Sequence, residues 1–105
     1  MIRAEFFRKG GLPVGFRISG HSGASEAGTD IVCAAVSSAA YLAANTVTDV
    51  MNIPAEASTA EGLMSFRVSE KDAAKCGDLL RGLRLHLSAL QQQYPGNITL
   101  IDTEV

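Results

Sequence analysis

The sequence feature that most constrains the fold is a run of eighteen residues without a charged side chain, from Ile31 to Thr48. A run of this length has to be tested against a membrane span, which needs about 20 predominantly apolar residues. Alanine outnumbers leucine and isoleucine in the run, no basic cluster flanks it, and several positions are polar: Ser37, Ser38, Asn45, Thr46 and Thr48. These features oppose a membrane span. We expect instead a helix from Asp30 to about Met51, buried nearly all round, whose alanines allow close approach of a sheet or a partner subunit.

Hydrophobic periodicity predicts the remaining elements. Residues 2–7 and 12–19 alternate with period two around the turn sequence RKGG, which is typical of a β-hairpin. Residues 52–62 are expected to form a linking loop, and residues 63–69 a third strand. A second helix is predicted from about Glu70 to Gln93, because apolar residues recur at helical spacing: Cys76, Leu79, Leu80, Leu83, Leu87 and Leu90. Residues 98–103 are predicted to form a closing strand.

This order of elements, ββαβαβ, predicts an α+β fold of two layers. We expect a mostly antiparallel four-stranded sheet with two main helices packed on it. The length of 105 residues is typical of one domain, so we expect residues 1–105 to form a single domain.

Charge and cysteine content exclude several classes of protein. The formal net charge is −2 and no basic stripe is present, which argues against a nucleic-acid partner. Charged residues near the N-terminus, Arg3, Glu5 and Arg8, lie where a signal peptide needs an apolar core, so we expect a cytoplasmic protein. In that compartment the distant cysteines Cys33 and Cys76 are expected to be free thiols.

A histidine and a cysteine flank the Gly/Ser-rich segment that precedes the first helix. If Asp30 is the N-cap, Cys33 is the third helical residue, where the helix macrodipole favours a thiolate and the carboxylate of Asp30 opposes it. His21, at the end of the second strand, is the candidate cation, and a Cys-His pair supplies a nucleophile and a general acid. Spacing alone favours Cys33 as a small buried residue of the helix packing, and His21 as a solvated or capping side chain.

The motif around these residues resembles the signature of the ribosomal-processing cysteine protease (Prp) family. The matching stretches are Gly20-His21-Ser22, where Ser22 replaces the usual alanine, and GTDIVCAAVS from Gly28 to Ser37. The length, the opening hairpin and the helix-strand ending fit as well, so the resemblance covers essentially the entire chain.

The resemblance implies a cysteine endopeptidase that removes an N-terminal extension from large-ribosomal-subunit protein number twenty-seven, cutting after an aromatic residue. It implies that Cys33 is the nucleophile and His21 the general base, that Asp30 and Ser37 are supporting residues, and that the protein is a homodimer. Small-residue packing on the first helix and the apolar Leu85 on the polar side of the second helix agree with a dimer. The loop glycines, Gly20, Gly23 and Gly28, predict a flexible segment that closes over a bound peptide.

The sequence disfavours other kinds of site. A zinc site formed by His21, Cys33, Cys76 and His86 is disfavoured, because no short CxxC or HxxxH spacing occurs, and we expect neither a metal nor another cofactor. Ser22 and Ser25 lack the strand-turn-helix context of a serine nucleophile, and no Walker lysine follows the loop glycines. The alternative to the protease is a non-catalytic ribosome-assembly or regulatory binding module with the same fold.

Overall fold

The computed structural model describes residues 1–21 and 30–105. Strands β1 (Ile2–Lys9) and β2 (Leu12–Ser19) form the opening hairpin, and helix α1 (Ile31–Asn45) continues into a π-helical turn, Thr46–Val50. A second hairpin follows, made of β3 (Ala55–Ala60) and β4 (Leu63–Val68). A 3₁₀ turn (Glu70–Asp72) leads into helix α2 (Ala73–Gln93), and β5 (Ile98–Glu104) ends the chain.

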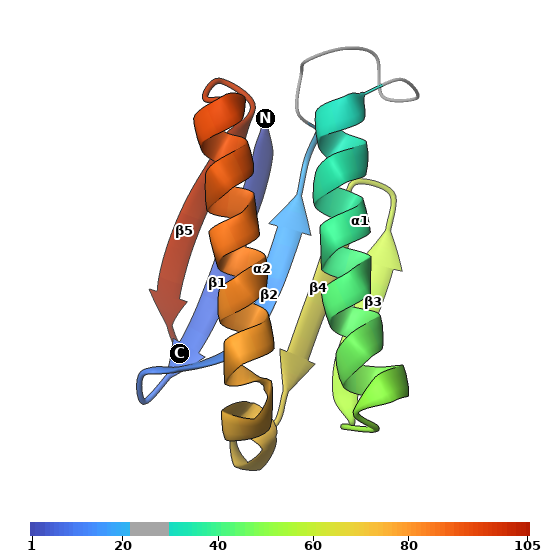
Figure 1. The fold of residues 1–105 in the computed structure, drawn as a ribbon, viewed down its shortest axis with the longest axis vertical. Helices are drawn as coiled ribbons and strands as arrows, with labels where there is room; N and C mark the ends of the chain where they lie inside the picture. The colour runs from blue at the N-terminus through green and yellow to red at the C-terminus, as the bar shows by residue number, and fades with distance from the viewer. Residues whose placement is uncertain (22–29) are drawn as a thin grey trace.

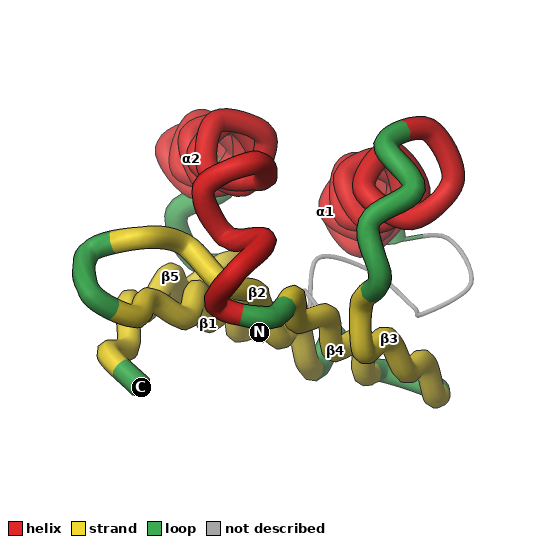
Figure 2. The backbone as a smooth tube through the Cα atoms, turned by 90° about the horizontal axis from the view of Figure 1, so that it is seen from below, coloured by secondary structure: helices red, strands yellow, loops and turns green. Residues whose placement is uncertain are grey.

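The sheet contains five strands in the order β3-β4-β2-β1-β5. The β1–β5 pair is parallel and the other three pairs are antiparallel. Both helices lie side by side on one face of the sheet, as the views in Figure 1 and Figure 2 show together. The predicted α+β class, the two layers and the mostly antiparallel sheet are therefore confirmed.

The prediction of four strands is wrong, because residues 55–60 form an edge strand and not part of a linking loop. The sequence of this strand, AEASTA, has no alternation of large apolar and polar residues, and most of its residues are exposed. Its conformation is set by backbone pairing with β4, which extends from Ala55 opposite Val68 to Ala60 opposite Leu63. Pairing of this kind leaves no periodic signal in the side chains.

The core fills the space between the sheet and the two helices. Alternate residues of the predicted strands point into it, with Phe16 stacked on Phe66 at a ring-centroid distance of 5.3 Å. The α2 stripe contributes four fully or nearly fully buried residues: Cys76, Leu80, Leu83 and Leu87. The strand faces and the α2 stripe thus pack as the periodicity predicts.

Helix α1 is not buried all round, contrary to the sequence-based expectation. Its buried residues form one stripe facing the sheet: Val32, Val36, Ala40, Ala43 and Ala44. The opposite side leaves large apolar side chains open, with Leu42 69% exposed and Ile31 68% exposed. The expectation failed because alanine and serine dominate the helix, so hydrophobicity is nearly uniform around it and does not reveal which side faces outward.

Among the described residues, one helical segment, Ile31–Val50, is long and apolar enough to cross a membrane by length and composition alone. A core helix of a globular protein meets the same criterion, and one side of this segment packs against the sheet with Val32, Val36 and Val47.

Candidate active site

The first turn of α1 holds Cys33 in a fixed position. Asp30 is the N-cap, as the sequence predicts, and its Oδ1 accepts hydrogen bonds from the backbone N–H groups of Val32 and Cys33, each at 3.0 Å. This carboxylate is only 4% exposed. It satisfies two of the amides that a helix start leaves free, and it places a negative charge beside the positive end of the helix.

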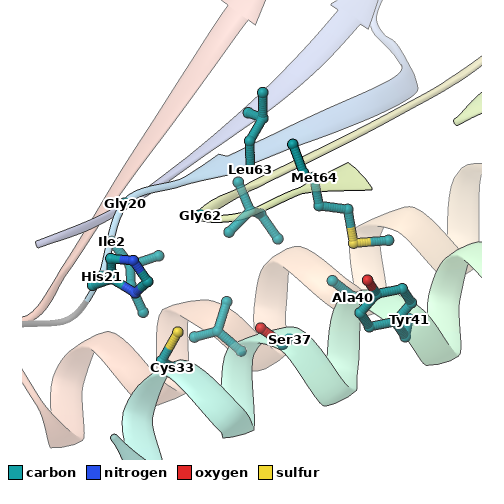
Figure 3. Close-up of a pocket in the computed structure, with 13 residues that line it drawn as sticks. Ile2, Gly20, His21, Cys33, Ser37, Ala40, Tyr41, Gly62, Leu63 and Met64 are labelled. Atoms are coloured by element: carbon teal, nitrogen blue, oxygen red, sulfur yellow. The ribbon is translucent and has the colours of Figure 1, made fainter. Parts of the chain in front are cut away.

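Cys33 and His21 line one pocket of about 110 Å³ between the start of α1 and the ends of β2 and β4. Figure 3 shows the Cys33 sulfur pointing into this pocket, with the His21 ring on the same side. Ser37, one helical turn after Cys33, also lines it. The structure therefore brings together the two residues proposed from sequence for catalysis and one of the two supporting residues.

The backbone before His21 has a conformation that suits glycine. Gly20 has φ +84°, and a Cβ at this position would lie 2.5 Å from the carbonyl oxygen of Met1. Both the dihedral angle and the close approach exclude a side chain. Gly20 thus ends β2 sharply and presents His21 at the pocket. The other two glycines of the predicted flexible loop, Gly23 and Gly28, lie outside the described residues.

The two cysteines occupy different environments. Cys33 is half-buried at the pocket, whereas Cys76 is completely buried on the core-facing side of α2. Burial raises the pKa of the Cys76 thiol, and the nearby Asp72 carboxylate raises it further. Cys76 is therefore a protonated packing residue. Cys33 is the more accessible of the two thiols.

Several pocket residues were not predicted from the sequence. The apolar wall contains Ile18, Met64 and Tyr41, and the turn between β3 and β4 contributes Gly62. Tyr41 follows Cys33 and Ser37 at intervals of four, so its helical spacing was a usable signal. The contribution of β4 and its turn had no such signal, because it depends on the pairing of β2 with β4.

The four residues considered as zinc ligands, two histidines and two cysteines, do not form one cluster. Cys76 lies in the core, and His86 lines a separate groove between α1 and α2. In the described ranges, 1–21 and 30–105, no group of three or more His, Cys, Asp or Glu residues is arranged to hold a metal ion.

Comparison with known proteins identifies the family. The profile of the family described as "Cysteine protease Prp" matches residues 1–99. No curated protein sequence matches significantly.

Solved structures with the same fold span nearly the whole chain. The Staphylococcus aureus ribosomal processing protease Prp with a covalently linked product peptide has a TM-score of 0.89 at 21% identity, covering 98% of this chain and 100% of that chain. The same S. aureus protease with a substrate peptide has a TM-score of 0.84 at 20% identity, with the same coverage. The protein SMU.848 from Streptococcus mutans has a TM-score of 0.85 at 26% identity, covering 100% of this chain and 99% of that chain.

Proposed function

Because the chain belongs to the Prp cysteine protease family, we propose that it is a cysteine endopeptidase with Cys33 as nucleophile and His21 as general base. The observation that carries this proposal is that one pocket holds both side chains, one from the first turn of α1 and one from the end of β2. A nucleophile beside a base, at a site open to a peptide, is the arrangement that acyl transfer requires.

In the proposed reaction, His21 takes the proton of the Cys33 thiol, and the thiolate attacks the carbonyl carbon of the scissile peptide bond. The C–N bond then breaks, and the imidazolium returns the proton to the leaving amine. The acyl group remains on the Cys33 sulfur as a thioester. Water, deprotonated by His21, attacks this thioester and releases the new carboxyl terminus and the thiol.

The proposed substrate is the N-terminal extension of large-ribosomal-subunit protein number twenty-seven, cut in the cytoplasm after an aromatic residue. Two observations support it: the family match, and the similarity to an S. aureus ribosomal processing protease whose structures contain a substrate peptide and a covalently linked product peptide. The apolar wall formed by Ile18, Tyr41 and Met64 is suited to a large apolar side chain of the substrate.

The proposal is tested with a synthetic peptide that spans the aromatic-small junction of the host's own extension. Wild type is expected to cleave it, and Cys33→Ala and His21→Ala are expected to lose cleavage by at least about a hundredfold. The matched control is Cys76→Ala, which should keep the activity and lose about 1 kcal/mol of stability through a small cavity. Cleavage that survives Cys33→Ala but not Cys76→Ala contradicts the assignment. Binding without cleavage by wild type would instead support the non-catalytic assembly module.

We also propose that the protein is a homodimer that pairs through the outer sides of the helices. A groove of about 560 Å³ runs between α1 and α2 and is lined mostly by small and apolar residues, Leu42 and Leu79 among them. Leu42, which lines the groove, is 69% exposed, and Leu85, outside the groove on α2, is 73% exposed. Exposed large apolar side chains along a groove are typical of an interface.

Light scattering coupled to gel filtration tests the dimer. Wild type should elute with twice the chain mass, and Leu42→Glu should elute with the mass of one chain because the charge would be buried in the interface. The control Thr59→Glu, on exposed strand β3, should keep the wild-type mass. A wild-type protein that is already monomeric would contradict the dimer.

A further inference from the structure

The turn between β3 and β4 lies against the residue that we propose as the general base. This turn consists of Glu61 and Gly62, since Ala60 and Leu63 already pair across the hairpin. The carbonyl oxygen of Gly62 accepts a hydrogen bond from the backbone N–H of Gly20 at 2.9 Å. The hairpin turn is thus fastened to the end of β2, one residue before His21.

The contact extends to the imidazole ring. A Cβ built at Gly62 would lie 3.5 Å from His21 Nε2, and it meets no other described atom within 4 Å outside its own chain neighbours. Figure 3 shows Gly62 on the β3–β4 turn next to the His21 ring, with Cys33 facing them from α1. A Cβ at position 62 would thus already be in van der Waals contact with the ring, so a longer side chain there would compete with the ring for space.

Two contacts with the β3–β4 turn therefore restrain the position of His21. The hydrogen bond from Gly20 to Gly62 sets where the backbone leaves β2, and the bare Gly62 surface limits the ring from one side. The side chain of His21 is exposed, so a packed core does not hold it. A base must lie within hydrogen-bond reach of its partner, and displacements near 1 Å cost about a hundredfold in rate.

We propose that Gly62 is a positioning residue for His21, and that the β3–β4 turn sets the ring over the pocket that contains Cys33. This proposal rests on the proposed role of His21 as general base. It assigns a function to the hairpin, whose first strand has almost no buried side chain of its own. In this proposal Gly62 takes no part in the chemistry; it acts through the position that it gives to the imidazole.

The test compares Gly62→Asn with Gly10→Asn. Both glycines have positive φ angles in hairpin turns, +70° and +59°, and Gly10 has open space where a Cβ would be added. Asparagine tolerates this left-handed region better than most residues, so the two substitutions carry a similar backbone cost. They differ in the contact with His21.

Two readouts are measured on both variants. Peptide cleavage should lose kcat by about tenfold or more in Gly62→Asn with KM nearly unchanged, and should stay near wild type in Gly10→Asn. The ring resonances of the two histidines, assigned through a His86→Asn variant, give a readout that does not depend on activity. The His21 resonance should move in Gly62→Asn, while the His86 resonance should stay in place in both variants.

The proposal is overturned if the His21 resonance does not move, or if kcat falls equally in both variants. If wild type cleaves no peptide, the proposed function fails, but the His21 resonance still decides whether Gly62 places the ring. If Gly62→Asn does not fold, the pair Gly62→Ser and Gly10→Ser repeats the comparison, because serine adds one atom beyond a Cβ that already contacts the ring at 3.5 Å.

Discussion

At the scale of single residues, Gly15 marks a close approach of two interior strands, β2 and β4. It lies in β2 opposite Arg67 of β4, and a Cβ at this position would lie 2.1 Å from the carbonyl oxygen of Phe66. The obstacle is backbone in a paired strand, which cannot rotate away as a side chain can. Gly15→Ala is therefore expected to lower the free energy of unfolding by about 1–3 kcal/mol, as overpacking does.

Urea denaturation of Gly15→Ala beside Gly96→Ala measures this cost. Gly96 lies in the turn before β5 and has nothing within 4 Å of an added Cβ, so its substitution should leave the midpoint nearly unchanged. Equal midpoints for both variants would mean that β2 and β4 can separate enough to admit a methyl group.

Individual site residues differed in how far the sequence reveals them. Cys33 and His21 were proposed from the resemblance to a family motif, because spacing alone left a packing role open. The N-cap role of Asp30 follows from its position just before the helix, and the structure confirms it. Gly62 and Met64 reach the same pocket only because β4 pairs with β2. Such contacts are set by strand order, which no local pattern encodes.

At the scale of secondary structure, Asp30 has two roles at the start of α1: it accepts hydrogen bonds from the helix, and it carries a negative charge near Cys33. Asp30→Ala removes the acceptor of two N–H groups and should lower the free energy of unfolding by about 1 kcal/mol. Asp30→Asn keeps an oxygen acceptor but removes the charge, so most of the stability should remain. Loss of that charge should also favour the thiolate of Cys33 and speed its alkylation by iodoacetamide at neutral pH.

The alkylation rate, the cleavage rate and the free energy of unfolding of both Asp30 variants are compared with those of wild type, with Asp49→Asn as the control. Asp49 is exposed in the π-helical turn at the far end of the helical segment, away from Cys33. If alkylation and cleavage both fall in Asp30→Asn while the stability stays, the carboxylate is needed by the site itself, for instance to orient His21.

A helix or strand was predictable from the sequence where one of its faces is buried, because burial makes apolar residues recur at a regular spacing. In β1, β2, β4 and α2 one face enters the core, and every second residue of the strands or every third to fourth residue of the helix is apolar there. Strand β3 has almost no buried side chains, so no hydrophobic period predicts it. Helix α1 is built mainly of small residues, so its sequence does not indicate which side is exposed.

At the scale of the whole molecule, β5 ties the end of the chain to its beginning. It pairs in parallel with β1 from Ile2 opposite Ile98 to Arg8 opposite Glu104. Asp102, on this strand, accepts two hydrogen bonds from Arg84 of α2, from Nε at 2.8 Å and from a terminal nitrogen at 2.6 Å. Arg8 of β1 approaches the same carboxylate at 3.6 Å. One side chain thus links the first strand, the last strand and the second helix.

This link should make stability depend on pH in a defined direction. The hydrogen bonds from Arg84 hold the pKa of Asp102 below its ordinary value of 3.8. A carboxylate with a lowered folded-state pKa stabilises fully above the unfolded value, and its contribution is lost as pH falls through the folded value. Asp102→Asn should therefore be less stable than wild type at neutral pH, by up to about 1 kcal/mol because the pair is partly exposed. The two unfolding free energies should converge below pH 3.8.

Chemical denaturation of both proteins from neutral to acid pH measures that difference. Glu70→Gln is the control, because Glu70 forms an exposed ion pair with Lys9 away from the groove between the helices, so its effect should stay near zero throughout. A difference between wild type and Asp102→Asn that persists unchanged into acid would assign the effect to packing of the side chain. A difference that is present above pH 3.8 and vanishes as the pH falls through the lowered pKa of Asp102 follows from the charge that joins β5 and β1 to α2.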